Sequence, residues 1–127
     1  MTDTPANGVL IVEDENEIRI LVALLFELEQ FTVYQATNGR AGLETFLDHR
    51  DEIVLLITDL GLPEMGGLEL VQKVRQMKPS LKIIGTSGFG RQSIREELLK
   101  AGGDVFVAKP FGVDDLIKTS KRLLGRI

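Results

Sequence analysis

Acidic side chains at two points of the chain are suited to holding a divalent cation. Glu13 and Asp14 follow the apolar run 9–12, and Asp59 follows the apolar run 53–58. If those runs form neighbouring strands of one sheet, three carboxylates converge, and such a cluster needs either raised pKa values or a cation. A hard ion with oxygen ligands, Mg²⁺ or Mn²⁺, fits this set of ligands. The absence of cysteine and the single histidine disfavour zinc.

Two other polar side chains follow later apolar runs and complete a chemical set. Ser87 comes just after the run 81–85, and Lys109 comes directly after the run 105–108. Carboxylates with a divalent cation, a lysine and a hydroxyl suit phosphoryl transfer, which depends on positioning and charge neutralisation. One of the three acids would then be the nucleophile that accepts the phosphoryl group.

Alternating strand-like and helix-like segments position these residues. Short apolar runs predict buried strands, and apolar residues three or four apart predict amphipathic helices. Five such β–α units indicate an α/β fold with a parallel sheet, whose ligands bind beyond the carboxyl ends of the strands. The predicted strands are 9–12, 31–35, 53–58, 81–85 and 105–108, and the predicted helices are 15–29, 39–48, about 68–74, 91–101 and 113–124.

Composition excludes several other classes of protein. The 127 residues carry a net charge of −4, which suits one globular domain and gives no basic face for direct nucleic-acid binding. A chain without cysteine has no disulfide, thiolate metal site or cysteine nucleophile. The longest apolar run, 20–26, is too short to cross a membrane, and the N-terminus has no signal-peptide pattern. These features predict a cytoplasmic protein without membrane contact.

Four motifs lie at the ends of predicted strands. They are Glu13-Asp14, TDLGLPEMGG at 58–67, TSG at 86–88 and FVAKPF at 106–111. Together they resemble the receiver domain of bacterial two-component response regulators, the CheY-like family. The resemblance extends from about Gly8 to Leu124, and it implies a flavodoxin-like (βα)5 doubly wound parallel sheet with strand order 2-1-3-4-5. It also implies an N-terminal extension at 1–7, a receiver domain at 8–124, a C-terminal end at 125–127 and no output domain.

The resemblance implies a role for each acidic residue. Asp59 would accept a phosphoryl group from a phosphohistidine on a sensor histidine kinase or a histidine phosphotransfer protein. Asp14 would bind Mg²⁺ or Mn²⁺ directly and Glu13 through water, with Asp59 and the backbone carbonyl of Gly61 as further ligands. Glu13 stands where many members have Asp. Gly66 stands where other members often have a polar residue. Gly61 lacks the side chain that faces the attacking water in many members, which leaves the lifetime of the aspartyl phosphate open.

The remaining motif residues would bind the phosphoryl group and switch the domain. Lys109 would pair with the phosphoryl oxygens, Ser87 would turn inward to bond them, and Gly88 would leave room for the donor. Phe106 would rotate together with Ser87, and the Lys109–Pro110 peptide is expected to be cis. The output partner would be a downstream protein or a fused output domain, with a possible phosphorylation-dependent dimer through 91–101, 105–108 and 113–124.

Other interpretations of the same residues stay open at this point. Phe106 suits a static core aromatic, and Lys109 suits a plain salt bridge in a pseudo-receiver that serves only as an interaction module. An aspartyl-phosphate phosphohydrolase is disfavoured, because Leu60-Gly61 offers no second acid close after the nucleophile. A receiver would modify only itself and turn over no external metabolite. His49 is predicted to be a solvated side chain.

The helix predicted at 15–29 is apolar on more than one side. A core stripe is predicted from Ile18, Leu21, Val22, Leu25 and Leu28. The other apolar side chains would form either an exposed docking surface for a kinase or phosphotransfer partner or part of an unusually buried helix. They are Ile20, Ala23, Leu24 and Phe26.

Overall fold

Strands and helices alternate along the whole chain in the computed structural model, which describes residues 5–62, 64–88 and 92–126. Each strand is followed by one helix, as the apolar patterning predicts. The predicted start of the fourth helix at Arg91, and Pro63 in the loop after Asp59, lie outside the described residues. The elements are β1 (Gly8–Val12), α1 (Asn16–Leu28), β2 (Thr32–Ala36), α2 (Gly39–Asp48), β3 (Ile53–Asp59), α3 (Gly67–Met77), β4 (Lys82–Ser87), α4 (Gln92–Ala101), β5 (Val105–Ala108) and α5 (Val113–Leu123).

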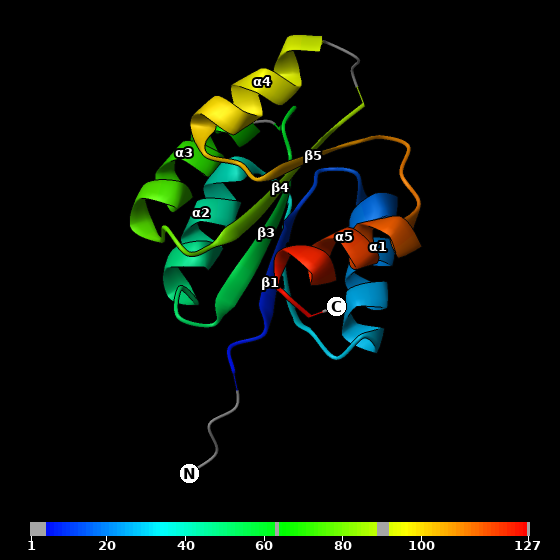
Figure 1. Ribbon diagram of the computed structural model, residues 1–127. Coiled ribbons are helices and arrows are strands. Elements are labelled where there is room, and N and C mark those ends of the chain that lie inside the picture. The colour runs from blue at the N-terminus through cyan, green and yellow to red at the C-terminus, as the bar shows by residue number, and fades with distance from the viewer. Residues whose placement is uncertain (1–4, 63, 89–91, 127) are drawn as a thin grey trace.

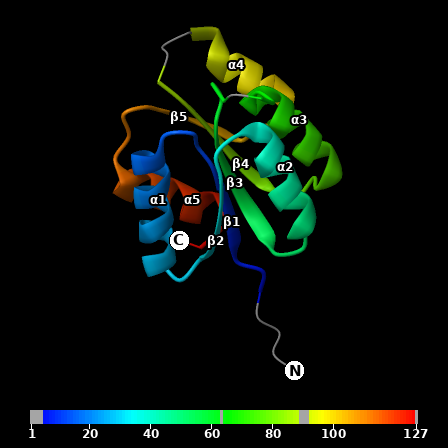
Figure 2. The same cartoon turned by 180° about the vertical axis from the view of Figure 1, so that it is seen from behind.

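The five strands form one parallel sheet in the order β2-β1-β3-β4-β5. This order confirms the predicted doubly wound fold. The right-handed crossover from β1 to β2 runs in one direction along the sheet and those from β2 to β5 run in the other, so their helices lie on opposite faces. Helices α1 and α5 cover one face of the sheet, and α2, α3 and α4 cover the other (Figures 1 and 2). The central strands β1 and β3 are almost wholly buried, which explains their continuous apolar sequence.

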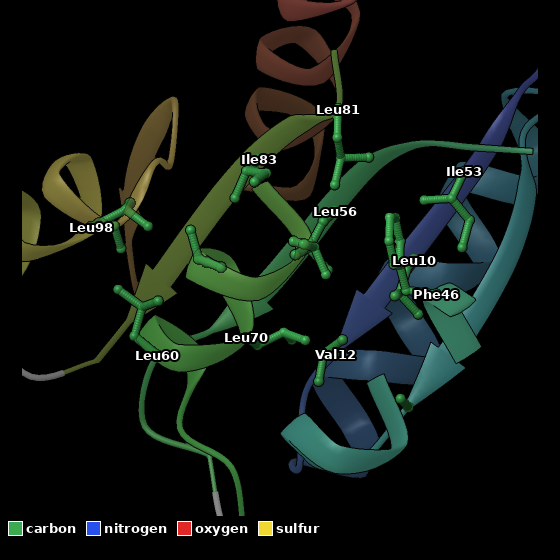
Figure 3. Close-up of a cluster of buried hydrophobic side chains, with 14 of the residues drawn as sticks. Leu10, Val12, Phe46, Ile53, Leu56, Leu60, Leu70, Leu81, Ile83 and Leu98 are labelled. Carbon is green, nitrogen blue, oxygen red and sulfur yellow. The ribbon is translucent and has the colours of Figure 1, made fainter. Parts of the chain in front are cut away.

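Two apolar clusters, one on each face, hold the helices against the sheet. The larger cluster joins the sheet to α2, α3 and α4 and contains the side chains labelled in Figure 3. Complete burial of one aliphatic or aromatic side chain contributes about 1.5–3 kcal/mol. The largest fully buried side chains of this cluster include Leu10, Phe46, Leu56, Leu70 and Leu98.

The predicted core stripe of α1 is partly wrong. Val22, together with Ala23 and Phe26, is buried against the sheet. Leu21 and Leu28, which were assigned to the stripe, are 48% and 64% exposed. Both sides of the helix are apolar, so periodicity alone does not distinguish the face that meets the sheet. The observed orientation is therefore rotated from the expected one.

Helix α1 consequently presents a row of apolar side chains outward. Ile20, Leu21, Leu24 and Leu28 are all exposed. We call these four side chains the α1 apolar surface. No helix in the described part of the chain has the length and apolar character needed to cross a bilayer.

Candidate functional site

Three carboxylates meet at the carboxyl ends of β1 and β3. Glu13 and Asp14 follow β1, and Asp59 ends β3, so the parallel pairing of these neighbouring strands brings the acids together. One ligand oxygen from each of the three lies within 4.8 Å of the others. Glu13 and Asp59 are buried, whereas Asp14 is exposed. The arrangement agrees with the predicted convergence and has the hard oxygen donors that Mg²⁺ prefers.

Lys109 supplies the positive charge that faces this cluster. Its Nζ atom lies 2.6 Å from Oε1 of Glu13 and 3.2 Å from Oδ2 of Asp59. Burial raises the pKa of Glu13 above its ordinary value, although the hydrogen bonds from Lys109 and from the Glu15 amide oppose that shift. Burial opposes the charge of Lys109 as well. The hydrogen bond to Glu13 and the charge of Asp59 outweigh it and raise the pKa of Lys109.

The turn between β1 and α1 holds Glu13 in place through backbone and side-chain hydrogen bonds. The Glu13 amide donates to the carbonyl of Ala36 at 3.0 Å, and Oε2 of Glu13 accepts from the Glu15 amide at 3.1 Å. Arg19 donates from Nη1 to the Glu13 carbonyl at 3.0 Å and from Nε to Oε1 of Gln35 at 3.2 Å. Arg19 was not predicted as part of the site, because no sequence pattern marks a donor to a backbone carbonyl.

The loop after β3 keeps Asp59 close to its neighbours. The Gly61 amide donates to Oδ1 of Asp59 at 3.0 Å, and the Leu60 amide donates to the Thr86 carbonyl at 2.8 Å. The start of α3 presses against this loop, since a Cβ atom on Gly67 would lie 2.3 Å from the Asp59 carbonyl oxygen. Glycine at this position therefore lets α3 approach the backbone that carries Asp59.

An open cavity of about 350 Å³ gives access to the acids and the lysine. Its size and polar lining leave room for a small anionic group next to the carboxylates. The cavity is lined by Asp14, Glu15, Asp59, Gly61, Gly88 and Lys109.

Ser87 and Phe106 lie on neighbouring strands near this cavity. In the register of β4 and β5, Phe106 pairs with Gly85 and Ser87 pairs with Ala108. Because side chains alternate along a strand, Ser87 and Phe106 project from the same face of the sheet. Ser87 is buried and Phe106 is half-buried. The Lys109–Pro110 peptide is cis, the isomer expected from the resemblance.

His49 keeps 39% of its side-chain surface exposed, in agreement with the solvated side chain that the sequence suggested, and it also packs against its neighbours. It is half-buried, and its ring stacks on Tyr34 with a centroid separation of 4.2 Å. Its Nδ1 atom lies 3.5 Å from Oε2 of Glu52, which also accepts a 2.7 Å hydrogen bond from the Tyr34 hydroxyl. This cluster belongs to β2, the end of α2 and the start of β3, and none of its residues lines the cavity beside Asp59.

The fold and the acidic cavity define a doubly wound α/β domain whose ligand site lies at the carboxyl ends of its strands. The family model of the response regulator receiver domain matches residues 9–121, and the chain belongs to that family. Membership of this family connects the chain with two-component phosphorelay signalling.

Individual relatives agree with the family assignment. The transcriptional regulatory protein SrrA of Staphylococcus aureus is 35% identical over 121 residues, which are 95% of this chain and 49% of SrrA. The chain thus spans about half the length of the curated relatives it matches. A CheY-like receiver domain protein from Methanospirillum hungatei JF-1 has a TM-score of 0.85 at 28% identity, with 94% of this chain and 95% of that chain covered. A receiver domain protein from Clostridium thermocellum has a TM-score of 0.87 at 23% identity over the same shares, which supports the fold.

Proposed function

We propose that Asp59 is the phosphoacceptor of this receiver domain. An Asp59 carboxylate oxygen attacks the phosphorus of a phosphohistidine on a partner, an O–P bond forms, the N–P bond breaks, and the histidine leaves with the electron pair of that bond. The observation that carries the proposal is the position of Asp59 beside both Lys109 and the two other acids at an accessible cavity. The domain modifies only itself and turns over no external metabolite.

The three acids are also the proposed cation site. Glu13, Asp14 and Asp59, together with the Gly61 carbonyl, would hold Mg²⁺ or Mn²⁺. When bound, the ion neutralises the negative charge that gathers on the phosphoryl oxygens during transfer. The three carboxylates have ligand oxygens within 4.8 Å of one another, and two of these residues are buried. Their negative charges repel one another at this distance, and a hard cation would remove that repulsion.

Four further residues bind the phosphoryl group and transmit its arrival in this proposal. Lys109 pairs with the phosphoryl oxygens, Gly88 leaves space for the donor, and Ser87 donates its hydroxyl from the end of β4. Phe106 then changes its rotamer on the same face of the sheet, and the surface of α4, β5 and α5 exchanges partners. Phosphorylation acts here by biasing two pre-existing conformations.

Intact-mass spectrometry with acetyl phosphate tests the acceptor directly. We expect one phosphoryl adduct on the wild-type chain in the presence of Mg²⁺, little adduct with EDTA, and none on Asp59→Asn. Glu44→Gln, which changes an exposed acid on α2, is the matched control and should be labelled like wild type. An adduct that persists in Asp59→Asn, or no adduct on wild type, would contradict the proposal and favour a pseudo-receiver.

The α1 apolar surface is the proposed docking site for the phosphohistidine-bearing partner. A cavity of about 400 Å³ next to it is lined by Ile18, Leu21, Phe111 and Val113, and also by Lys109 and Gly88 of the acceptor site. A partner helix that covers this surface and the cavity would therefore lie next to Lys109 and Gly88 of the acceptor site. Glu17 and Glu27 on α1 add negative charge, which favours a partner with basic residues beside its apolar ones.

A charge placed on this surface should slow transfer from the partner. Leu24→Glu is expected to reduce phosphotransfer from the cognate kinase or phosphotransfer protein at least tenfold and to leave labelling by acetyl phosphate unchanged. Leu47→Glu on α2 is the control, because Leu47 is 49% exposed and Leu24 is 52% exposed. Equal transfer rates for the two folded variants would refute the docking site.

The output side of the domain is proposed to act through protein contact. A downstream protein or a fused output domain would read the surface of α4, β5 and α5, and the same surface would form a phosphorylation-dependent dimer. The chain itself would bind neither nucleic acid nor membrane and would act in the cytoplasm. Sedimentation of the wild-type chain with and without acetyl phosphate tests the dimer.

A further inference from the structure

The guanidinium group of Arg95 on α4 lies over the ring of Phe106 on β5. The Cζ atom is 5.5 Å from the ring centroid, within the range of a cation–π interaction. Arg95 is exposed and Phe106 is half-buried. Within the described residues Arg95 has neither a hydrogen bond nor an ion pair, so the ring is the partner that places its side chain.

The packing of α4 on the sheet brings Arg95 to this position. Leu98 is fully buried, and a Cβ atom on Gly85, the residue paired with Phe106, would lie 2.8 Å from both Leu98 methyl carbons. A Cβ atom on Gly103 would lie 2.4 Å from Leu98. Gly85 and Gly103 thus allow Leu98 to pack α4 closely against β4 and against the loop before β5. Arg95 lies one helical turn before Leu98, and its side chain extends over the edge strand β5.

We propose that the half-buried arrangement of Phe106 in this structure is the unswitched one, and that Arg95 is a positioning residue that holds the ring in it. The inference rests on the proposed function, in which Phe106 changes rotamer after Asp59 is phosphorylated. A contact made in one arrangement and weakened in the other biases the equilibrium between them. Arg95 therefore sets how readily the unphosphorylated domain adopts the switched arrangement.

The contact is of a size that can tune a switch without locking it. An exposed cation–π pair shifts a two-state equilibrium by roughly two- to fivefold. Loss of the guanidinium should move the unphosphorylated domain toward the switched arrangement by that factor. In this proposal the switched arrangement is the one that reacts with acetyl phosphate, so the labelling rate of Asp59 should rise with the population of that arrangement.

Fluorine NMR of the full chain labelled with 4-fluorophenylalanine tests the proposal, with the Phe106 resonance assigned from Phe106→Leu. We expect Arg95→Gln to shift this resonance, without a phosphodonor, in the direction that acetyl phosphate shifts it in wild type. The same variant should be labelled by acetyl phosphate two- to fivefold faster. Arg95→Lys, which keeps a cation, should restore most of the wild-type behaviour. Lys100→Gln removes an exposed charge from the same helix and is the matched control.

A double-mutant cycle distinguishes positioning from a general effect on α4. In the Phe106→Leu background, Arg95→Gln should no longer change the labelling rate, because the ring that it acts through is gone. If Arg95→Gln behaves like Lys100→Gln in both measurements, the inference is refuted while the phosphoacceptor proposal stands. If wild type forms no adduct at Asp59, the proposed function fails, and Arg95 is then reduced to a packing contact with Phe106.

Discussion

The ammonium nitrogen of Lys109 lies 2.6 Å from Oε1 of Glu13. The same nitrogen is 3.2 Å from Oδ2 of Asp59, so one cation serves two buried carboxylates. Each ion pair offsets the desolvation penalty of burying its two charges. Removal of one partner leaves the remaining charges buried without compensation, which destabilises the folded state. The acceptor site is therefore also a point on which the stability of the domain depends.

Loss of Lys109 should destabilise the metal-free domain and increase its dependence on a divalent cation. Lys109→Met leaves Glu13 and Asp59 without a counter-charge, and we expect a loss of about 3–5 kcal/mol in EDTA. Added Mg²⁺ should restore part of this loss, because it supplies charge to the same carboxylates. Urea unfolding followed by circular dichroism measures both effects. Lys118→Met, which changes an exposed lysine on α5, is the control and should neither destabilise the chain nor make its stability depend on Mg²⁺. A Lys109→Met chain as stable as wild type in EDTA would contradict the prediction.

The raised pKa of Glu13 predicts how stability depends on pH without metal. The folded chain holds the Glu13 proton to higher pH than the unfolded chain, in which the pKa is near 4.5. The resulting stability is complete below that ordinary value and is lost as pH rises through the higher pKa of the folded state. Wild type should therefore lose stability relative to Glu13→Gln as pH increases from 4.5 toward neutrality.

Thermal unfolding in EDTA at several pH values checks this sign. Glu17→Gln, which removes an exposed acid from α1, should follow the pH profile of wild type. A stability difference between wild type and Glu13→Gln that stays constant with pH, or that changes in the opposite direction, would show that burial does not raise the pKa of Glu13. Added Mg²⁺ should reduce the pH dependence, since a bound cation favours the ionised carboxylate.

Two adjacent glycines at the start of α3, Gly66 and Gly67, should respond very differently to substitution by alanine. A Cβ atom on Gly67 would lie 2.3 Å from the Asp59 carbonyl oxygen and 2.6 Å from the Leu60 Cα atom, so that the acceptor backbone has to move. Gly67→Ala should cost about 1–3 kcal/mol and slow acetyl phosphate labelling several-fold. Gly66 has φ of −62° and nothing within 4 Å of its position for Cβ, so Gly66→Ala should preserve both properties. Similar labelling rates for the two variants would contradict this prediction.

Much of the fold could be predicted because its central strands are buried on both faces. Runs such as 53–58 are continuously apolar, and the polar residues that end them lie where parallel strands place their ligand site. Glu13, Asp59 and Lys109 were predicted on that basis, and the structure brings them together. The order of the strands came from the resemblance, since β–α alternation alone allows several orders.

The remaining features could not be predicted, for identifiable physical reasons. Helix α1 carries apolar residues on most of its circumference, so its periodicity did not identify Val22 rather than Leu21 as a core residue. Arg19 and Arg75 donate to backbone carbonyls, a group that every residue offers, and such bonds leave no sequence pattern. The contact between Arg95 and Phe106 depends on how closely α4 packs, which the sequence does not specify locally.

Arg75 on α3 connects the loops that precede β4 and β5, and its loss should destabilise that side of the sheet. Its guanidinium donates to the carbonyls of Gly102, Pro79 and Leu81 at 2.8, 2.8 and 2.6 Å, and it pairs with Asp104 at 2.9 Å. Arg75→Met should cost about 2–4 kcal/mol, because several partly buried acceptors lose a charged donor. Arg75→Lys should recover only part of this, since an ammonium group lacks the planar fork that reaches all four partners.

Chemical unfolding of these variants distinguishes the contribution of the planar guanidinium geometry from that of the positive charge alone. Arg122→Met and Arg122→Lys, on the exposed side of α5, are the controls and should remain within about 0.5 kcal/mol of wild type. Hydrogen exchange should show the loss at the Ile83 amide, which donates to Oδ2 of Asp104 at 2.8 Å beside the guanidinium. If Arg75→Lys equals wild type in stability and in protection of that amide, the charge alone is sufficient and the argument from geometry is wrong.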